Sequence, residues 1–335
     1  MRTRQIAAAG AALAAAAALT LSACGAPADS GSASGDQKTL KVGIIGIGSD
    51  AGITLAQQKG FFEKQGITVE TTVVANPAAG IAAAQSGQLD ITYAPSIPYL
   101  NARSQKVPLK VLAAADGYRD NAVAETAKDA TAVDDTGLYA GKDSGITRPK
   151  DLEGKKVSVP ARKAQLEVTI ANAVKQDGGD PAKINWMVLD PNSALQSLEQ
   201  GRVDASGLVA PFTIKAKESG AKFIASPGVE FFEKGAVGLW IAGDSTVQKK
   251  SAGVQSFIKA IYEANAYANE NYDEAQKVAA EVTKVPLETV KQTAMTYWPT
   301  EVRAADLQRA SDKLAALGYL PEAVKIDDAD VVTAQ

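Results

Sequence analysis

One short motif occurs twice in this chain, once in each half. The first copy is GQLDITYAPS at 87–96, and the second is GRVDASGLVAPF at 201–212. In each copy a helical pattern ends at a glycine, a short apolar run typical of a buried strand follows, and Ala-Pro ends that strand. Because open α/β sheets hold ligands at the carboxyl ends of their strands, two such units predict two similar lobes facing each other across a cleft.

Strand and helix patterns alternate around both copies. Short loops join these patterns, which predicts a mostly parallel sheet flanked by helices in each lobe. Segment 116–136 is acidic, rich in Ala and Thr and weakly periodic, so we expect it to be an irregular crossing or a surface insertion. The strand patterns lie at 40–45, 67–74, 109–115, 137–140, 155–159, 184–189, 221–225 and 238–242.

The last part of the chain, 251–320, has a helical pattern almost throughout. Val254, Phe257 and Ile261 lie on one apolar stripe, and Leu307 and Leu314 lie on another. Such stripes are typical of helices that cover a core. We therefore expect these helices to pack on the first lobe, and we assign them no binding role.

Histidine and cysteine usage excludes several kinds of chemistry. The 335 residues include no histidine and a single cysteine, Cys24. This composition excludes Ser-His-Asp and Cys-His nucleophile systems, an intrachain disulfide and the commonest zinc ligand. No metal or cofactor is expected, and catalysis by Asp, Glu, Lys or Tyr stays open but disfavoured.

The N-terminus resembles a bacterial lipoprotein signal. Arg2 and Arg4 precede a run of mostly alanine and leucine, and LSAC ends at Cys24. This predicts cleavage before Cys24 and acylation of its thiol, against the alternative of a transmembrane anchor. A Gly/Ser/Ala-rich tether would follow through residue 38, with the protein held on the outer face of the cytoplasmic membrane.

The overall charge disfavours nucleic-acid binding. The full chain has 35 basic and 38 acidic side chains, and loss of Arg2 and Arg4 with the leader leaves a net charge of −5. A mildly acidic chain without runs of basic residues is a poor binder of phosphate backbones.

Seven stretches in order resemble the solute-binding lipoproteins of ABC importers, in the branch that takes up nitrate, taurine, alkanesulfonates and thiamine precursors. The resemblance spans about 39–271. In chain order they are the lipobox-like LSAC, which lies before this span and agrees with it independently, and then LKVGI, LAQQKGFFEKQGITVE, AAAQSGQLDITYAPS, KDSGITRPKDLEGKKVSVP, LEQGRVDASGLVAPF and VGLWIAGD.

The resemblance implies a periplasmic-binding-protein-like fold of type II that closes about a hinge. Lobe one would comprise 39–138 and 226–335, and lobe two 139–225. The chain would act as a monomer, capture a small solute and deliver it to an ABC permease and its ATPase. No catalysis is implied.

Candidate ligand contacts follow from the strand ends and the helix starts behind them, where free N–H groups favour an anionic head group. Ser96 can instead be a simple N-cap, Arg162 a solvated arginine and Trp240 a buried core residue. Asp50 would repel an anion, so it either contacts an amine or caps the next helix. The candidates are Ser49, Asp50, Asn76, Ser96, Arg162, Gln165, Pro211, Phe212 and Trp240, with Arg119 as a weaker anion partner.

The loops after the two strands are weakly polar, which favours an organic anion over nitrate. An alkanesulfonate, a taurine-like solute or an aromatic carboxylate or sulfonate would each fit Phe212. Alternatives are a thiamine pyrimidine-precursor binder, and a sensor or partner-binding protein of the same fold. An enzyme resembling the thiamine-pyrimidine synthases is disfavoured because those enzymes consume a histidine of their own.

Overall fold

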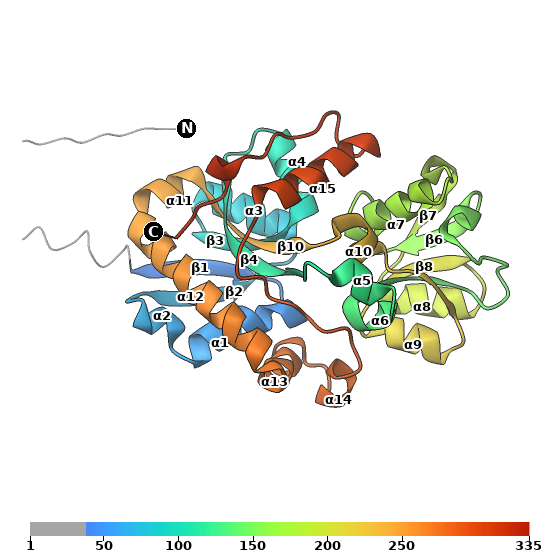
Figure 1. Ribbon diagram of the computed structural model, residues 1–335, viewed down its shortest axis with the longest axis horizontal. Coiled ribbons are helices and arrows are strands. Elements are labelled where there is room, and N and C mark those ends of the chain that lie inside the picture. Colours follow the sequence, from blue (N-terminus) through green and yellow to red (C-terminus); the bar gives the residue numbers. More distant parts are fainter. Residues whose placement is uncertain (1–37, 335) are drawn as a thin grey trace, which may run out of the picture.

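The computed structural model describes residues 38–334 as two α/β units joined by two crossings (Figure 1). We call the unit built on the sheet β2-β1-β3-β10-β4 lobe one, and the unit built on β7-β6-β8-β5-β9 lobe two. The lipoprotein motif, Cys24 and the tether through Gln37 lie outside the described residues.

The sheet of lobe one is mostly parallel, as the sequence predicts. β1 pairs in parallel with β2 and β3, and β10 runs antiparallel between β3 and β4. The antiparallel strand is the one that brings the chain back from lobe two. The strands are β1 (Thr39–Ile44), β2 (Thr68–Val73), β3 (Ile91–Pro95), β4 (Leu109–Tyr118) and β10 (Gly235–Gly243).

The sheet of lobe two has the same plan. β6 pairs in parallel with β7 and β8, and β5 enters antiparallel to β8 and β9. Here too the antiparallel strand is the one that arrives from the other lobe. The strands are β5 (Thr136–Ala140), β6 (Lys156–Val159), β7 (Asn185–Val188), β8 (Ala205–Val209) and β9 (Lys222–Ala225).

The repeated motif performs the same structural task in both lobes. Gly87 and Gly201 have φ of 77° and 67°, the left-handed conformation expected where helices α3 (Pro77–Ser86) and α8 (Pro191–Glu199) end. The aspartate three residues later fixes the neighbouring strand. The Asp90 carboxylate accepts a hydrogen bond from the Lys41 amide, and the Asp204 carboxylate accepts one from the Lys156 amide, each at 2.8 Å.

Helices cover both faces of the sheet in lobe one. One face packs against α1 (Ala51–Gln58), α2 (Phe61–Lys64) and α12 (Ser251–Glu270) through a cluster that includes Phe62, Trp240 and Phe257. The other face packs against α3, α4 (Ser96–Ser104) and α15 (Ala304–Ala316). The C-terminal helices therefore return to lobe one as predicted, as do α13 (Tyr272–Thr283) and α14 (Leu287–Val290) (Figure 1).

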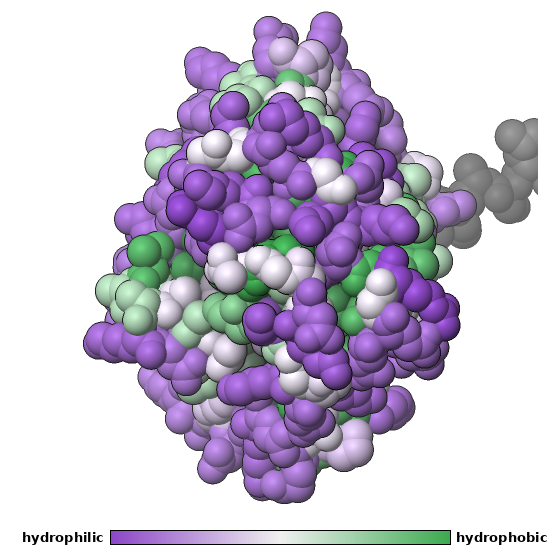
Figure 2. All heavy atoms as spheres, turned by 90° about the vertical axis from the view of Figure 1, so that its right-hand side faces the viewer, coloured by the Kyte–Doolittle hydropathy of each residue, from purple (hydrophilic) through white to green (hydrophobic). Residues whose placement is uncertain are grey.

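Lobe two is covered by α7 (Gln165–Gln176) on one face, where Leu166, Ile170 and Val174 form the predicted apolar stripe. Helices α8 and α9 (Phe212–Glu218) cover the other face. Viewed from its end, lobe two is mainly hydrophilic with hydrophobic side chains gathered across the middle (Figure 2). Within residues 38–334, no helix has the length and apolar character needed to cross a bilayer.

A buried carboxylate joins the two crossings. Asp134 accepts hydrogen bonds from the Tyr118 hydroxyl at the end of β4 (2.9 Å) and from the Val229 amide in α10 (Pro227–Phe232; 3.0 Å). The amide and hydroxyl of Thr136 complete its shell. Segment 116–136 is thus a crossing, as expected, but it is less irregular than expected, since it contains the end of β4 and the short helices α5 (Ala122–Thr126) and α6 (Ala130–Val133).

Candidate functional site

The carboxyl ends of the strands of lobe one bring three positions into one row. Pro95 at the end of β3 pairs with Gly238 of β10, and Gly238 pairs in turn with Asp116 of β4. All three lie at the sheet edge that faces lobe two. This is the edge at which an open α/β sheet holds its ligands.

The Asp116 carboxylate is held in a defined position at this edge. Its Oδ1 accepts the Gly238 amide at 2.9 Å, and its Oδ2 accepts the Tyr93 hydroxyl at 3.0 Å. Glycine is required at 238, since a Cβ there would lie 2.3 Å from Asp116 Oδ2 and 2.7 Å from Tyr93 Cε2. Asp116 nevertheless remains partly accessible to solvent, so the carboxylate is both fixed and reachable.

Ser49 and Asp50 follow β1 at the same edge. Asp50 Oδ2 accepts the amides of Gly46 (2.7 Å) and Ile47 (3.1 Å), which folds the loop around the carboxylate. Asp50 is only 1% exposed, yet its Oδ1 has no hydrogen-bond partner in residues 38–334, whereas the buried Ser49 hydroxyl lies beside Asp116. The expected capping of the next helix is wrong, because the Asp50 side chain makes no capping bond to α1.

Asp135 lies at the edge of the lobe-two sheet where the chain enters it from lobe one. It directly precedes β5, and its carbonyl accepts the Ala210 amide at 2.8 Å, next to the Pro211 position predicted to touch ligand. The Asp135 side chain is open to solvent, but protein surrounds it closely. Asp135 therefore lies where the crossing from lobe one enters the sheet of lobe two.

Burial and mutual repulsion act on these carboxyl groups. Burial raises the pKa of Asp50 to about 6, with a smaller contribution from the negative charge of Asp116. Crowding by the surrounding protein raises the pKa of Asp135, and the carboxylates of Asp134 and Asp116 raise it further. Burial also raises the pKa of Asp116, against the lowering effect of Ser49, Tyr93 and the Gly238 amide. Negative charge is therefore concentrated between the lobes.

The structure corrects the prediction for Ser96. Pro95, with extended φ and ψ, occupies the N-cap position, and Ser96 is the first residue of α4. Its side chain is fully buried and its hydroxyl has no partner within the described part of the chain. Ser96 is therefore not an N-cap, and the structural role weighed against ligand binding does not apply.

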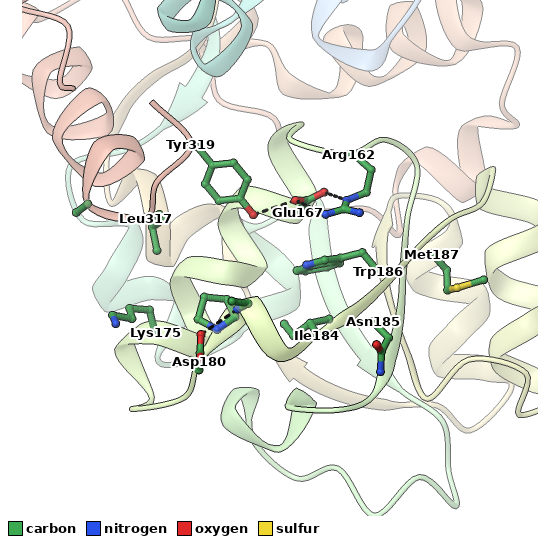
Figure 3. A pocket seen from close by; sticks show the side chains of 13 residues that line it. Arg162, Glu167, Lys175, Asp180, Ile184, Asn185, Trp186, Met187, Leu317 and Tyr319 are labelled. Carbon is green, nitrogen blue, oxygen red and sulfur yellow. Dashed lines mark hydrogen bonds and ion pairs between the residues drawn. The ribbon is translucent and has the colours of Figure 1, made fainter. Parts of the chain in front are cut away.

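Arg162 is not free to bind an anion in this state. Its Nε donates to Glu167 Oε2 at 2.6 Å, and Glu167 also accepts the Lys163 amide and the Tyr319 hydroxyl. These groups line a groove of about 680 Å³ between lobe two and the segment after α15, with the Trp186 ring beneath them (Figure 3). The Arg162 side chain is 51% exposed, and its charge is balanced by the Glu167 carboxylate of α7, the helix that follows it.

The other predicted residues separate into three groups. Asn76 is exposed and is the N-cap of α3, where its Oδ1 accepts the Ala79 amide at 2.9 Å. Gln165 and Pro211 are half-buried at the starts of α7 and α9, and Phe212 packs partly on the Leu208 cluster. Trp240 does not line a cleft and takes the alternative core position: its ring is 1% exposed and packs in the core of lobe one.

The anion candidate Arg119 also has a local partner. Its guanidinium lies 4.5 Å from the centre of the Tyr297 ring. A cation held over an aromatic face in this way is stabilised without a carboxylate.

Comparison with known proteins agrees with this architecture. A family model described as NMT1/THI5 like matches residues 49–275, about two thirds of the chain. The chain belongs to the NMT1/THI5-like family. This confirms the resemblance seen in the sequence, since sulfonate- and taurine-binding proteins are among the relatives of this NMT1/THI5-like chain.

Two relatives and one solved structure are similar to this NMT1/THI5-like chain. A protein of Bacillus subtilis (strain 168) that carries the name of an aliphatic sulfonates-binding protein is 24% identical over 322 residues, covering 93% of this chain and 90% of the relative. The taurine-binding periplasmic protein of Escherichia coli (strain K12) is 24% identical over 204 residues, covering 61% and 58%. The aliphatic sulphonate binding protein SsuA from Escherichia coli has a TM-score of 0.69 at 18% identity, covering 86% and 95%, which shows the shared fold.

Sequence analysis did not identify Asp116 or Asp135 as site residues of this NMT1/THI5-like chain. Both were assigned to the weakly periodic crossing. Asp116 could have been found by the argument applied to Ser96, since it directly follows the buried run at 109–115. Asp135 carries no comparable pattern, because it precedes its strand and reaches the edge only through the antiparallel entry of β5.

Proposed function

We propose that this chain is the extracytoplasmic solute-binding component of an ABC import system. It captures a small organic solute between its lobes, closes about the Asp134 crossing and presents the solute to a permease. The observation that supports this most directly is that two similar sheets lie on the two sides of the crossings, with Asp116 in β4 of lobe one and Asp135 directly before β5 of lobe two. Membership of a family that includes binding proteins adds to it.

We further propose an organic acid of the sulfonate or carboxylate class as the ligand, held without catalysis. The names of the aliphatic sulfonates-binding and taurine-binding relatives support the sulfonate class. The Ser49 hydroxyl, the unpartnered Ser96 hydroxyl and the loop at Pro211–Phe212 are the proposed contacts, and Arg162 would join only after exchanging Glu167 for the ligand. An aminopyrimidine is the second candidate, favoured by the carboxylates at Asp50 and Asp116.

The proposed location is the outer face of the cytoplasmic membrane, through a lipid on Cys24. The N-terminal motif and the periplasmic assignment in the name of the taurine-binding relative support it. A single copy of the chain would bind the solute.

Thermal unfolding of the protein without its leader tests this function. The panel contains taurine, alkanesulfonates, aromatic sulfonates and carboxylates, nitrate and aminopyrimidines. A ligand at about a thousand times its Kd adds about 4 kcal/mol to the stability of the folded state, which raises Tm by several degrees. We expect such a rise with an organic acid and none with nitrate. A rise with aminopyrimidines alone would favour the second candidate, and no rise with any compound would contradict solute capture of this class.

A further inference from the structure

We propose that Trp298 is a positioning residue for the lobe-one side of the ligand cleft, and that residues 297–299 hold the carboxyl ends of β1 and β4 in place. This inference rests on the proposed function, because it concerns how that binding surface is held rather than which groups touch the ligand. It gives a role in binding to a part of the C-terminal region that the apolar stripes of the sequence do not suggest.

The Trp298 side chain holds the loop that follows β1. Its indole N–H donates to the Ser49 carbonyl at 3.0 Å. Trp298 is 1% exposed and Ser49 is 8% exposed, so water does not compete for this bond. The hydroxyl of the same serine lies beside the Asp116 carboxylate. One hydrogen bond therefore fixes the backbone of a residue whose side chain reaches the cleft.

The backbone of the segment holds the end of β4. Residues 297–299 lie between α14 and α15, where the chain runs past this end of the strand (Figure 1). β4 is the outer strand of its sheet, and Tyr297 pairs with Gly117 in an antiparallel bridge in which the Gly117 amide donates to the Tyr297 carbonyl at 3.0 Å. Gly117 directly follows Asp116, so the bridge fixes the backbone at that carboxylate.

Two asparagines of α12 hold the segment itself. The Asn269 side chain donates to the Trp298 carbonyl at 2.7 Å and accepts the Trp298 amide at 3.2 Å. Asn265 Nδ2 donates both to the Pro299 carbonyl (2.8 Å) and to the Ala114 carbonyl of β4 (3.0 Å). The two asparagines are four residues apart and share one face of the helix. Buried polar groups that are satisfied in this way specify one arrangement of the chain.

The Trp298 ring also packs closely against the start of α1. A Cβ on Gly52 would lie 2.9 Å from Trp298 Cδ1, and Ala51 and Leu55 belong to the same buried cluster as the ring. Helix α1 begins directly after the loop at Gly48–Asp50. The ring therefore limits how far this loop can move with its helix.

The bond from Trp298 differs from the other bonds of the loop. Asp50 accepts the amides of Gly46 and Ile47, which closes the loop on itself. The Trp298 bond instead ties the loop to the segment that also holds β4. Without it the buried Ser49 carbonyl would lose its donor, and the loop would shift to hydrate this oxygen. Binding groups held in place before the ligand arrives lose little freedom on binding, so we expect the shift to weaken affinity.

Hydrogen exchange tests the positioning role without any ligand. Trp298→Phe keeps an aromatic ring and removes the indole N–H. The amides of Gly46, Ile47 and Asp50, which are hydrogen-bonded within the loop, should exchange about fivefold faster or more, the scale of one lost hydrogen bond. The amides of α7 in lobe two should be unchanged.

Calorimetric titration of the protein without its leader tests the effect on binding, with taurine and propane-1-sulfonate as probes. At a temperature where every variant is fully folded, Trp298→Phe should weaken the sulfonate that the wild type binds by about 5- to 20-fold. Asn269→Ala keeps the Trp298 side chain and releases the backbone of the segment, and it should act in the same direction.

Phe62→Leu is the matched control. It removes a ring that is 1% exposed from the core of the same lobe, where Phe62 stacks on Phe257. It should lower Tm, as Trp298→Phe should, but leave loop exchange and sulfonate affinity within about twofold of the wild type. Affinity separates the two roles, because a residue that serves only the fold changes the folded fraction and not the Kd of the folded protein.

The outcomes separate this inference from the proposed function. Unchanged exchange at residues 46–50 in Trp298→Phe would overturn the positioning role, whatever happens to affinity. Faster exchange with an unchanged Kd would show that the loop moves without consequence for binding, and would overturn the role in binding. If the wild type binds neither sulfonate, capture of these sulfonates is contradicted, and the exchange rates alone then decide whether Trp298 holds the loop.

Discussion

The two copies of the repeated motif are alike at the amino end of their strands and different at the carboxyl end. Asp90 and Asp204 each accept a backbone amide from the neighbouring parallel strand, at the same distance and in the same register. Beyond the strands, the first copy leads to the buried, unpartnered hydroxyl of Ser96, whereas the second leads to the half-buried ring of Phe212.

This difference separates the part of the motif that makes the sheet from the part that meets the cleft. The amino end must place two strands correctly in either lobe, so the same residue types are required. In the proposed function, the carboxyl end faces a ligand whose two sides differ chemically. A polar, acidic wall at Asp50 and Asp116 and an apolar, aromatic one at Phe212 are the expected result.

The largest effects should come from the shared aspartates. Asp90→Ala removes an acceptor from the Lys41 amide and also leaves the Lys250 ammonium without its carboxylate, so we expect a loss of about 2–3 kcal/mol. Asp204→Ala removes only the bond to the Lys156 amide, because no ion pair of Asp204 is found within residues 38–334, and should cost about 1 kcal/mol.

Urea unfolding followed by circular dichroism measures both losses. Asp90→Asn is the matched control, since it keeps an acceptor for the Lys41 amide and removes only the charge. Its stability should fall between those of the wild type and Asp90→Ala. An equal loss in the two alanine variants would show that the Lys250 pair contributes nothing.

A second comparison concerns the residues two positions beyond each aspartate. Thr92 faces Gly43 across the strand pair in lobe one, and Ser206 faces Ser158 in lobe two, where the two hydroxyls lie 2.6 Å apart. Gly43→Ala would place a methyl 2.8 Å from Thr92 Oγ1 and 2.7 Å from a Leu89 methyl, which should destabilise the protein by about 2 kcal/mol through overpacking.

Ser158→Ala tests the equivalent position of lobe two. It removes the short hydroxyl contact and leaves Ser206 only a long one to the Ala194 carbonyl at 3.5 Å, so we expect a cost of about 1 kcal/mol. Urea midpoints of the two alanine variants decide the comparison. If Ser158→Ala proves the more damaging, then close packing at Gly43 is relieved by movement of Thr92.

Much of the fold could be predicted because local patterns and the repeat agree. The strands at 40–45 and 155–159, the apolar face of α7 and the return of the C-terminal helices follow from periodicity and order. The sequence left Trp240 open between a cleft wall and the core, because its position beside a crossing did not reveal which face of β10 it occupies. In the structure it points into the core between Tyr93 and Phe257.

The site was only partly predictable for a similar reason. Ser49 and Asp50 follow a clear strand, and their place at its carboxyl end was evident from the sequence. Asp135 reaches the opposite edge through strand pairing between distant segments, which no local pattern encodes. The pairing of Arg162 with Glu167, five residues away, depends on the turn before α7.

The smallest stability change should come from Ser96, and it reverses the usual sign. The hydroxyl is buried and has no partner in the described chain, so Ser96→Ala removes an unsatisfied group without breaking a bond. We expect the free energy of unfolding to stay unchanged or to rise by up to about 1 kcal/mol, while affinity for the organic ligand falls. Phe212→Ala, at the equivalent point of the second copy, should instead cost about 1–2 kcal/mol because it withdraws a ring from the Leu208 cluster. Urea unfolding with and without ligand separates the two effects. A clear loss of stability in Ser96→Ala without ligand would mean that the hydroxyl serves the fold, and the two ends of the motif would then differ less than proposed.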